Sequence, residues 1–160
     1  MNRQPVLGLA LLIAAVALVT TSCGSSKNKA HAVSKADFAK TMNSLCHSAS
    51  ASSSALGGAQ NMADLATNGP GYVAAENNLL DQLQKLEPPA EIKTQVNDYL
   101  SKTKEVLSLA NKLIAAAKKN DSAAFVKITS TAGPEVKTAG TAIHADEKAI
   151  GATACISEGF

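Results

Sequence analysis

The side chains of this 160-residue chain with the clearest chemical potential are three cysteines and three histidines. Cys46 and His47 are adjacent, but neighbours on a helix point about 100° apart and cannot act together as nucleophile and base. Zinc requires three or four protein ligands, and no two of the histidines, at positions 31, 47 and 144, are three or four residues apart. We therefore find no catalytic set and expect no enzyme activity.

The acidic residues also form no recognisable site. In a di-iron bundle, Glu-x-x-His motifs project inward from facing helices, and this sequence contains no such motif. We expect the following carboxylates to be solvated on the polar faces of helices: Glu76, Asp81, Glu87, Glu91, Asp98 and Glu105.

The first 22 residues have the organisation of an export signal. Arg3 supplies a basic start, an uncharged apolar run extends from Val6 to Val19, and small residues follow up to Cys23. This three-part order is typical of a signal peptide. A permanent membrane span needs about 20 apolar residues, so the run is short for one.

Cys23 has a specific interpretation in this context. The residues Val-Thr-Thr-Ser-Cys, 19–23, resemble the lipobox of bacterial lipoproteins. The resemblance implies that Cys23 receives a diacylglyceryl group carrying palmitate-type chains and becomes the new N-terminus, anchored to the outer face of the cell membrane. We expect residues 1–22 to be a lipoprotein signal peptide, 23–33 the lipidated cysteine and a flexible tether, and 34–160 one folded domain.

Charge and aromatic content exclude some partners. Removing residues 1–22 removes one charge, Arg3, from the 15 basic residues of the chain and leaves 14 against 13 acidic ones. A nearly neutral chain is not a nucleic-acid binder by electrostatics. The chain has no Trp and few other aromatic residues, too few for base-stacking platforms or sugar-binding clefts: Phe38, Tyr72, Tyr99, Phe125 and Phe160.

The elements that must position these residues are helices. Apolar or small residues recur at alternating steps of four and three, which is the period of a core-facing helix. The clearest case runs from Ile92 to Ala117, and weaker seams run from Phe38 to Ala59, from Tyr72 to Leu86 and from Phe125 to Ile150. The helix expected from Phe38 onward begins at a capping sequence, Ser34–Asp37. Asp121 can cap the helix that contains Phe125 to Ile150.

Serine, glycine and proline mark the expected interruptions. The serine- and glycine-rich segment predicts a break or bend between Ser50 and Gly58. Asn68–Tyr72 predicts a turn, and Glu87–Glu91 ends the second helix at Pro88 and Pro89. Pro134 predicts a kink or break near Ala132 and Gly133 in the last helix.

Four helices with short connections predict an all-α, antiparallel bundle. In this topology the start of the first helix and the end of the fourth lie at the same end of the bundle. If Cys23 is lipidated, Cys46 and Cys155 remain, and two cysteines of an exported protein are expected to pair. We therefore predict a bundle closed by a Cys46–Cys155 disulfide.

The same topology leaves one metal hypothesis open. A disulfide between their helices would bring His47 and His144 closer, and two histidines are candidate ligands of a metal ion or haem. We prefer the alternative, in which both histidines are solvated beside the disulfide, and expect no metal and no cofactor.

The mature chain resembles a group of small actinobacterial lipoproteins and secreted proteins without an assigned activity. The group has a cysteine on its first helix, a Leu-Pro-Pro turn, an Asp-x-Ala-Ala-Phe helix start and a cysteine near its C-terminus. The corresponding segments here are Ser44–Ala49, Leu83–Ile92, Asn120–Ile128 and Ala149–Phe160, with Glu87 separating the leucine from the prolines. The resemblance implies the fold and the localisation but no substrate or cofactor.

These observations lead to two functional hypotheses. The first is a lipid-anchored module of the cell envelope that binds an envelope protein or component without catalysis. The alternative is an extracytoplasmic carrier of a small ligand (lipid, haem or metal) that uses a cavity in the Ala- and Ser-rich core. The membrane is a partner in both hypotheses, through acylated Cys23, and the identity of the ligand stays open.

Overall fold

The computed structural model describes residues 33–157, all of which belong to one compact unit. The expected signal peptide, Cys23 and His31 lie outside the described residues. The helices are α1 (Lys35–Ser54), α2 (Met62–Gln84), a 3₁₀ turn η1 (Ala90–Ile92), α3 (Lys93–Lys118), α4 (Ser122–Ile150) and α5 (Thr153–Ser157). The described part of the chain contains no strand.

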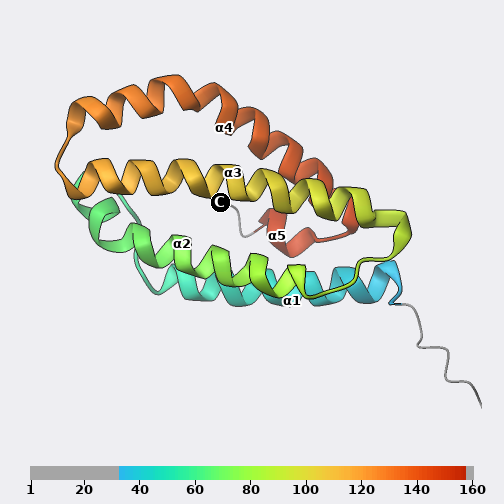
Figure 1. The fold of residues 1–160 in the computed structure, drawn as a ribbon. Helices are drawn as coiled ribbons and strands as arrows, with labels where there is room; N and C mark the ends of the chain where they lie inside the picture. Colours follow the sequence, from blue (N-terminus) through green and yellow to red (C-terminus); the bar gives the residue numbers. More distant parts are fainter. Residues whose placement is uncertain (1–32, 158–160) are drawn as a thin grey trace, which may run out of the picture. The chain divides into compact units, whose positions relative to one another are not determined.

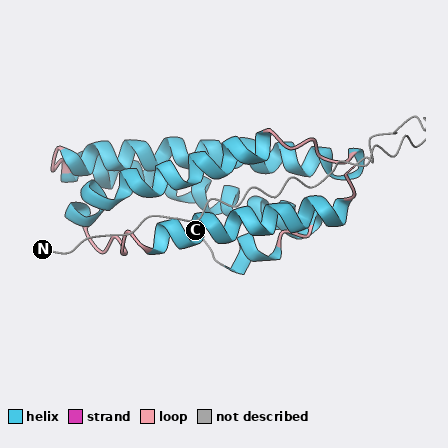
Figure 2. Ribbon diagram, turned by 90° about the horizontal axis from the view of Figure 1, so that it is seen from below, coloured by secondary structure: helices cyan, strands magenta, loops and turns pink. Residues whose placement is uncertain are grey.

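The four long helices alternate in direction along the chain and share a common axis direction, as the two ribbon views show (Figure 1, Figure 2). α2 packs against α1 and α3, and α3 packs against α4. The predicted antiparallel bundle is therefore confirmed. Its fully buried large side chains come from α1, α2 and the end of α4: Phe38, Met42, Leu79, Leu80, Leu83 and Ile150.

Local sequence signals fix several helix ends. The Ser34 hydroxyl accepts a hydrogen bond from the Asp37 backbone N–H at 3.1 Å, which confirms the predicted capping start of α1. α1 ends at Ser54, within the segment where a break was predicted. Asp121 caps α4, because its carboxylate accepts from the Ala124 N–H at 2.9 Å.

The predicted turn at Asn68–Tyr72 is wrong, because α2 continues through it with Pro70 in its interior. The two glycines there serve helix packing. A Cβ on Gly69 would lie 2.7 Å from Ile114 Cγ1, and a Cβ on Gly71 would lie 2.7 Å from Leu56 Cδ1. α2 begins after its Asn61 cap, well before Tyr72, where the apolar pattern of the second predicted helix starts.

Pro134 also lies inside a continuous helix. A break near Ala132 and Gly133 is therefore wrong, whereas a bend remains consistent with the curved ribbon of α4 in Figure 1. Proline removes one hydrogen bond of the helical ladder, and such helices bend rather than end when packing holds both halves.

The fifth helix was not predicted, and it closes the bundle. Of the last two helices, α5 rather than α4 packs against α1. Gly151 reverses the chain in a left-handed conformation (φ 96°), which glycine adopts without strain. The Asn43 side chain on α1 then holds the junction, since it accepts from the Ala154 N–H at 2.7 Å and donates to the Gly151 carbonyl at 3.2 Å.

The disulfide lies at this junction. Cys46 on α1 and Cys155 on α5 are bonded, with their Cα atoms 5.2 Å apart. The pairing predicted from the cysteine count is therefore confirmed. Among residues 33–157, no helix combines the length and the apolar character that a membrane span requires.

The glycine packing gives a first prediction. Gly69→Ala should lower the free energy of unfolding by about 1–2 kcal/mol, because overpacking costs about 1–3 kcal/mol and the helix propensity of alanine returns up to about 1. Gly71→Ala should cost less, because Leu56 is only half-buried and its side chain can move. Urea unfolding of both variants measures the difference. A Gly69→Ala protein as stable as the parent would contradict the close approach of α2 and α3.

Candidate functional site

A cavity of about 350 Å³ lies among α2, α3, α4 and α5. α2 and α4 both pack on α3, and neither packs extensively on the other, so the cavity occupies the space between them. Its volume falls within the range of small-molecule sites in proteins. Most of its wall is apolar, formed by Val73, Val106, Leu107, Ala110, Val136 and Ile143.

Two carboxyl groups reach this apolar space. Glu76 on α2 is 5 % exposed and Glu147 on α4 is 4 % exposed. The expectation that Glu76 is solvated is therefore wrong. The remaining acidic residues of that set are exposed as predicted: Asp81, Glu87, Glu91, Asp98 and Glu105.

Glu76 is the more unusual of the two groups. Its Oε1 atom is buried and has no hydrogen-bond partner. Burial raises the pKa of Glu76 from 4.5 to about 7, with the nearby Glu147 carboxylate acting in the same direction. At neutral pH this carboxyl is therefore close to its titration midpoint inside the protein.

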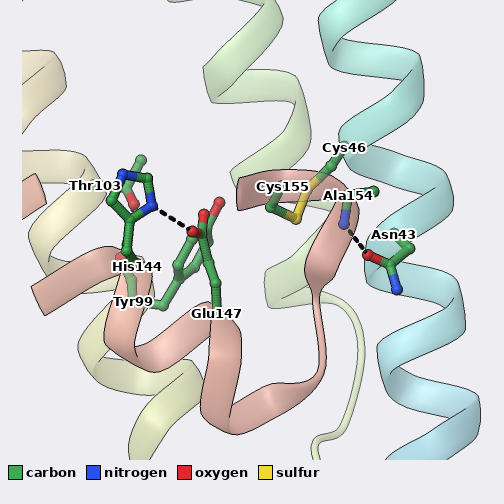
Figure 3. Close-up of polar contacts among 8 residues, drawn as sticks. All are labelled: Asn43, Cys46, Tyr99, Thr103, His144, Glu147, Ala154 and Cys155. Carbon is green, nitrogen blue, oxygen red and sulfur yellow. Dashed lines mark hydrogen bonds and ion pairs between the residues drawn. A yellow bond between two sulfur atoms is a disulfide. The ribbon is translucent and has the colours of Figure 1, made fainter. Parts of the chain in front are cut away.

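Glu147 has a partner within its own helix. His144 Nδ1 lies 2.9 Å from Glu147 Oε2 (Figure 3). Burial raises the pKa of Glu147, and the hydrogen bond with His144 opposes this rise. The imidazole side chain is half exposed while the carboxylate is 5 % exposed, so His144 stands between the buried Glu147 and solvent.

α3 supplies two side chains with hydroxyl groups, Tyr99 and Thr103, and α2 supplies a third, Tyr72. Burial raises the pKa of Tyr99, and the charges of Glu76 and Glu147 add to this effect, so the phenol keeps its proton at neutral pH. The buried Thr103 hydroxyl donates to the Tyr99 backbone carbonyl at 2.8 Å. Tyr99 therefore offers the cavity a polar group that stays neutral, and the Thr103 proton is already engaged within α3.

An ion pair fixes α4 beside this site. Lys102 Nζ on α3 lies 2.8 Å from Asp146 Oδ2 on α4, and neither residue lines the cavity. Asp146 precedes Glu147, so the pair holds the turn of α4 that carries the buried carboxyl.

The two histidines of the metal hypothesis do not both line the cavity. His144 lines the cavity, whereas His47 is exposed on α1 and does not line it. The described residues contain no group of three or more His, Cys, Asp or Glu side chains that could hold a metal ion. Cys46 is bonded to Cys155, so neither is a free thiol beside the cavity.

The carboxyl pair was not predicted from the sequence, although a signal for it exists. Val73, Glu76, Leu80 and Leu83 are spaced three, four and three residues apart, so Glu76 occupies a seam position of α2. Ile143, Glu147 and Ile150 repeat the pattern on α4. An acidic residue at a seam position is a candidate for burial.

Comparison with known proteins adds nothing to this geometry. No protein-family model, no curated protein and no solved structure matches the chain.

Proposed function

We propose that this chain is a lipid-anchored binding protein of the cell envelope that holds a small ligand in the cavity between α2, α3 and α4. The apolar wall would receive the body of the ligand, and the few polar groups at Glu76, Tyr99 and Glu147 would orient it, as in small-molecule sites generally. The envelope location and the membrane anchor rest on the lipobox-like residues 19–23.

The observation that carries this proposal is the unpartnered carboxyl oxygen of Glu76. Buried polar groups are nearly always hydrogen-bonded, and an exception in a folded protein requires an explanation. Leaving such a group without a partner costs about 1–3 kcal/mol, and more if it is charged. A ligand that supplies the missing donor explains both the cavity and the group within it.

The exposed surface gives less support to the alternative, a docking module for another protein. Such a module would present a contiguous apolar patch. The exposed large apolar side chains among the described residues are instead distributed over the residues before α1, two separate turns of α4, and α5: Val33, Val126, Val136 and Ile156. We therefore propose the cavity, rather than an exposed surface, as the binding site.

Binding without turnover is part of the proposal. The cavity-lining cysteine is held in a disulfide, and the Thr103 hydroxyl donates to a backbone carbonyl instead of to a base. An activated nucleophile needs an adjacent general base within hydrogen-bond reach, and these groups do not provide that arrangement.

Gly140 on α4 allows a test that leaves the fold intact. It lines the cavity, and a Cβ placed on it would meet no heavy atom within 4 Å. Gly140→Leu should therefore fill the cavity while it improves helix propensity by about 0.5–1 kcal/mol. The matched control is Ala145→Leu, which adds a leucine to an exposed position of the same helix.

Native mass spectrometry of the protein extracted gently from its own membrane measures the effect. We expect a stoichiometric small adduct, beyond the acyl group, on the parent protein and on the Ala145→Leu protein, and its loss from the Gly140→Leu protein. An adduct that persists in Gly140→Leu would show that any bound molecule lies elsewhere and would overturn the proposal.

A further inference from the structure

We propose that the ligand carries a protonated amino group, which binds the carboxylate of Glu76, on an otherwise apolar body. This inference rests on the proposed function, because it assigns the chemical class of the ligand for the same cavity.

The charges around the cavity lead to this assignment. Its lining contains two carboxyl groups, Glu76 and Glu147, and a single basic side chain in the described part of the chain, His144. His144 is already bonded to Glu147. The protein therefore provides a hydrogen-bond partner for Glu147 and none for the buried Oε1 atom of Glu76.

The hydrogen-bonding state of Glu76 indicates what is missing. An ionised carboxylate is only an acceptor, and the buried Oε1 atom receives no hydrogen bond. An ammonium group offers three donors and a full positive charge. Bonds between such ionised groups are shorter and about twice as strong as neutral ones, and the low dielectric of a buried site strengthens them further.

Ligands of other charge fit less well. An anion would be a third negative group in a cavity that already holds two carboxyls, and like charges brought together there repel strongly. A neutral alcohol would fill the apolar space and could donate one hydrogen bond, but it would leave the carboxylate without a counter-charge. A small hydrated cation such as free ammonium also fits poorly. It would lose its water against the apolar side chains of Val73, Leu107 and Ile143, which offer no hydrogen bonds in return.

Three probes of one length separate these cases: hexylamine, hexan-1-ol and hexanoate. The full-length processed protein, held in nanodiscs of neutral lipid at pH 8, is titrated with each probe. Binding is followed by the NMR shifts of the methyl groups of Val106, Leu107 and Ile143, which line the cavity. The methyl group of Met42, a buried residue that does not line the cavity, serves as reference. We expect hexylamine to bind at least about tenfold more tightly than hexan-1-ol, since a buried charged hydrogen bond contributes more than the 1.4 kcal/mol of a tenfold change.

Two variants connect this preference to its cause. Glu76→Gln should bind hexan-1-ol as before and lose the preference for hexylamine. Glu105→Gln removes an exposed carboxylate of α3 that does not line the cavity and should keep the preference. The parent selectivity is itself decisive, so the test does not depend on either variant folding.

The outcomes separate the two proposals. If hexan-1-ol or hexanoate shifts the cavity methyl groups as strongly as hexylamine, or if Glu76→Gln keeps the amine preference, the ligand class is wrong and the binding function stands. If none of the three probes shifts these methyl groups, both proposals fail.

Discussion

Reduction of the Cys46–Cys155 disulfide is expected to lower the free energy of unfolding by about 4–5 kcal/mol, on the chain-entropy treatment of a cross-link between residues 109 positions apart. For a domain of this size the melting temperature should fall by roughly 10–20 °C. The loss is large relative to the roughly 5–15 kcal/mol that stabilises a typical domain.

The position of the bond gives a second reason for a large effect. α5 has five residues, and so short a helix is not stable by itself. Besides the disulfide, its polar attachment to α1 runs through Asn43, which bonds Ala154 and Gly151. Reduction should therefore first release α5 from α1. The cavity wall at Cys155 would then open.

Circular dichroism melting of the oxidised and reduced protein measures this effect. The Cys46→Ala/Cys155→Ala protein is the control, and alanine is chosen because both cysteines are buried, at 3 % and 5 % exposed. It should melt like the reduced parent and should not respond to reductant. Equal melting temperatures for the oxidised and reduced parent would contradict this account.

Much of this fold could be predicted from the sequence, because helical seams and caps are local signals. The α3 seam from Ile92 to Ala117 needs no tertiary information, and Ser34 and Asp121 mark helix starts through their own side chains. Cysteine count and bundle topology together indicated the disulfide.

The errors occur where tertiary contacts override local signals. Asn68–Tyr72 has the composition of a turn, yet Gly69 and Gly71 are needed there because Ile114 and Leu56 approach the α2 backbone. Nothing in the sequence alone distinguishes a packing glycine from a turn glycine. α5 was missed for a related reason, since a five-residue helix shows no period and depends on Cys155 and Asn43 for its position.

The candidate site was the hardest part to predict. Each carboxyl occupies a seam position of its own helix, but only the packing of α2 and α4 around α3 shows that they share a cavity. Glu76 was predicted to be solvated, because no local pattern links it to Glu147, which lies on a helix far away in the sequence. A polar residue in an otherwise apolar seam should therefore be tested for burial before it is assigned to solvent.

The buried Glu76 carboxyl should make the stability of the unliganded protein fall as pH rises. Its pKa is about 7 in the folded chain, against 4.5 for an unperturbed glutamate, so between these values the folded state binds the proton more tightly than the unfolded state. The stabilising contribution of the protonated Glu76 is then fully present below pH 4.5, declines through the window from about 4.5 to 7, and is lost above it. At about 1.4 kcal/mol for each pH unit, the decline amounts to about 3 kcal/mol.

The groups facing Glu76 do not reverse this direction. From α4, burial raises the pKa of Glu147, which shifts stability the same way, although its hydrogen bond with His144 reduces the rise. From α3, Tyr99 keeps its proton throughout this window, because burial and the two carboxylates raise its pKa.

Glu76→Gln should remove most of this dependence. A glutamine at position 76 does not titrate, so the variant should match the parent near pH 5 and exceed it by about 2–3 kcal/mol at pH 8. Urea unfolding at pH 5, 6, 7 and 8 measures both proteins, with Glu105→Gln as the exposed control whose curve should run parallel to that of the parent. Parallel curves for the parent and Glu76→Gln would show that Glu76 is not desolvated in the folded protein.

The same measurement connects stability to the proposed ligand. Above pH 7 the folded protein holds an ionised carboxylate that lacks a counter-charge, and a bound ammonium group would supply it. Hexylamine should therefore stabilise the parent most at pH 8 and progressively less towards pH 5, where Glu76 is protonated. Stabilisation by hexan-1-ol should depend much less on pH, because the alcohol has no charge to pair with that of Glu76. Stabilisation by hexylamine that is independent of pH would mean that the amine does not contact this carboxylate, even if it binds in the cavity.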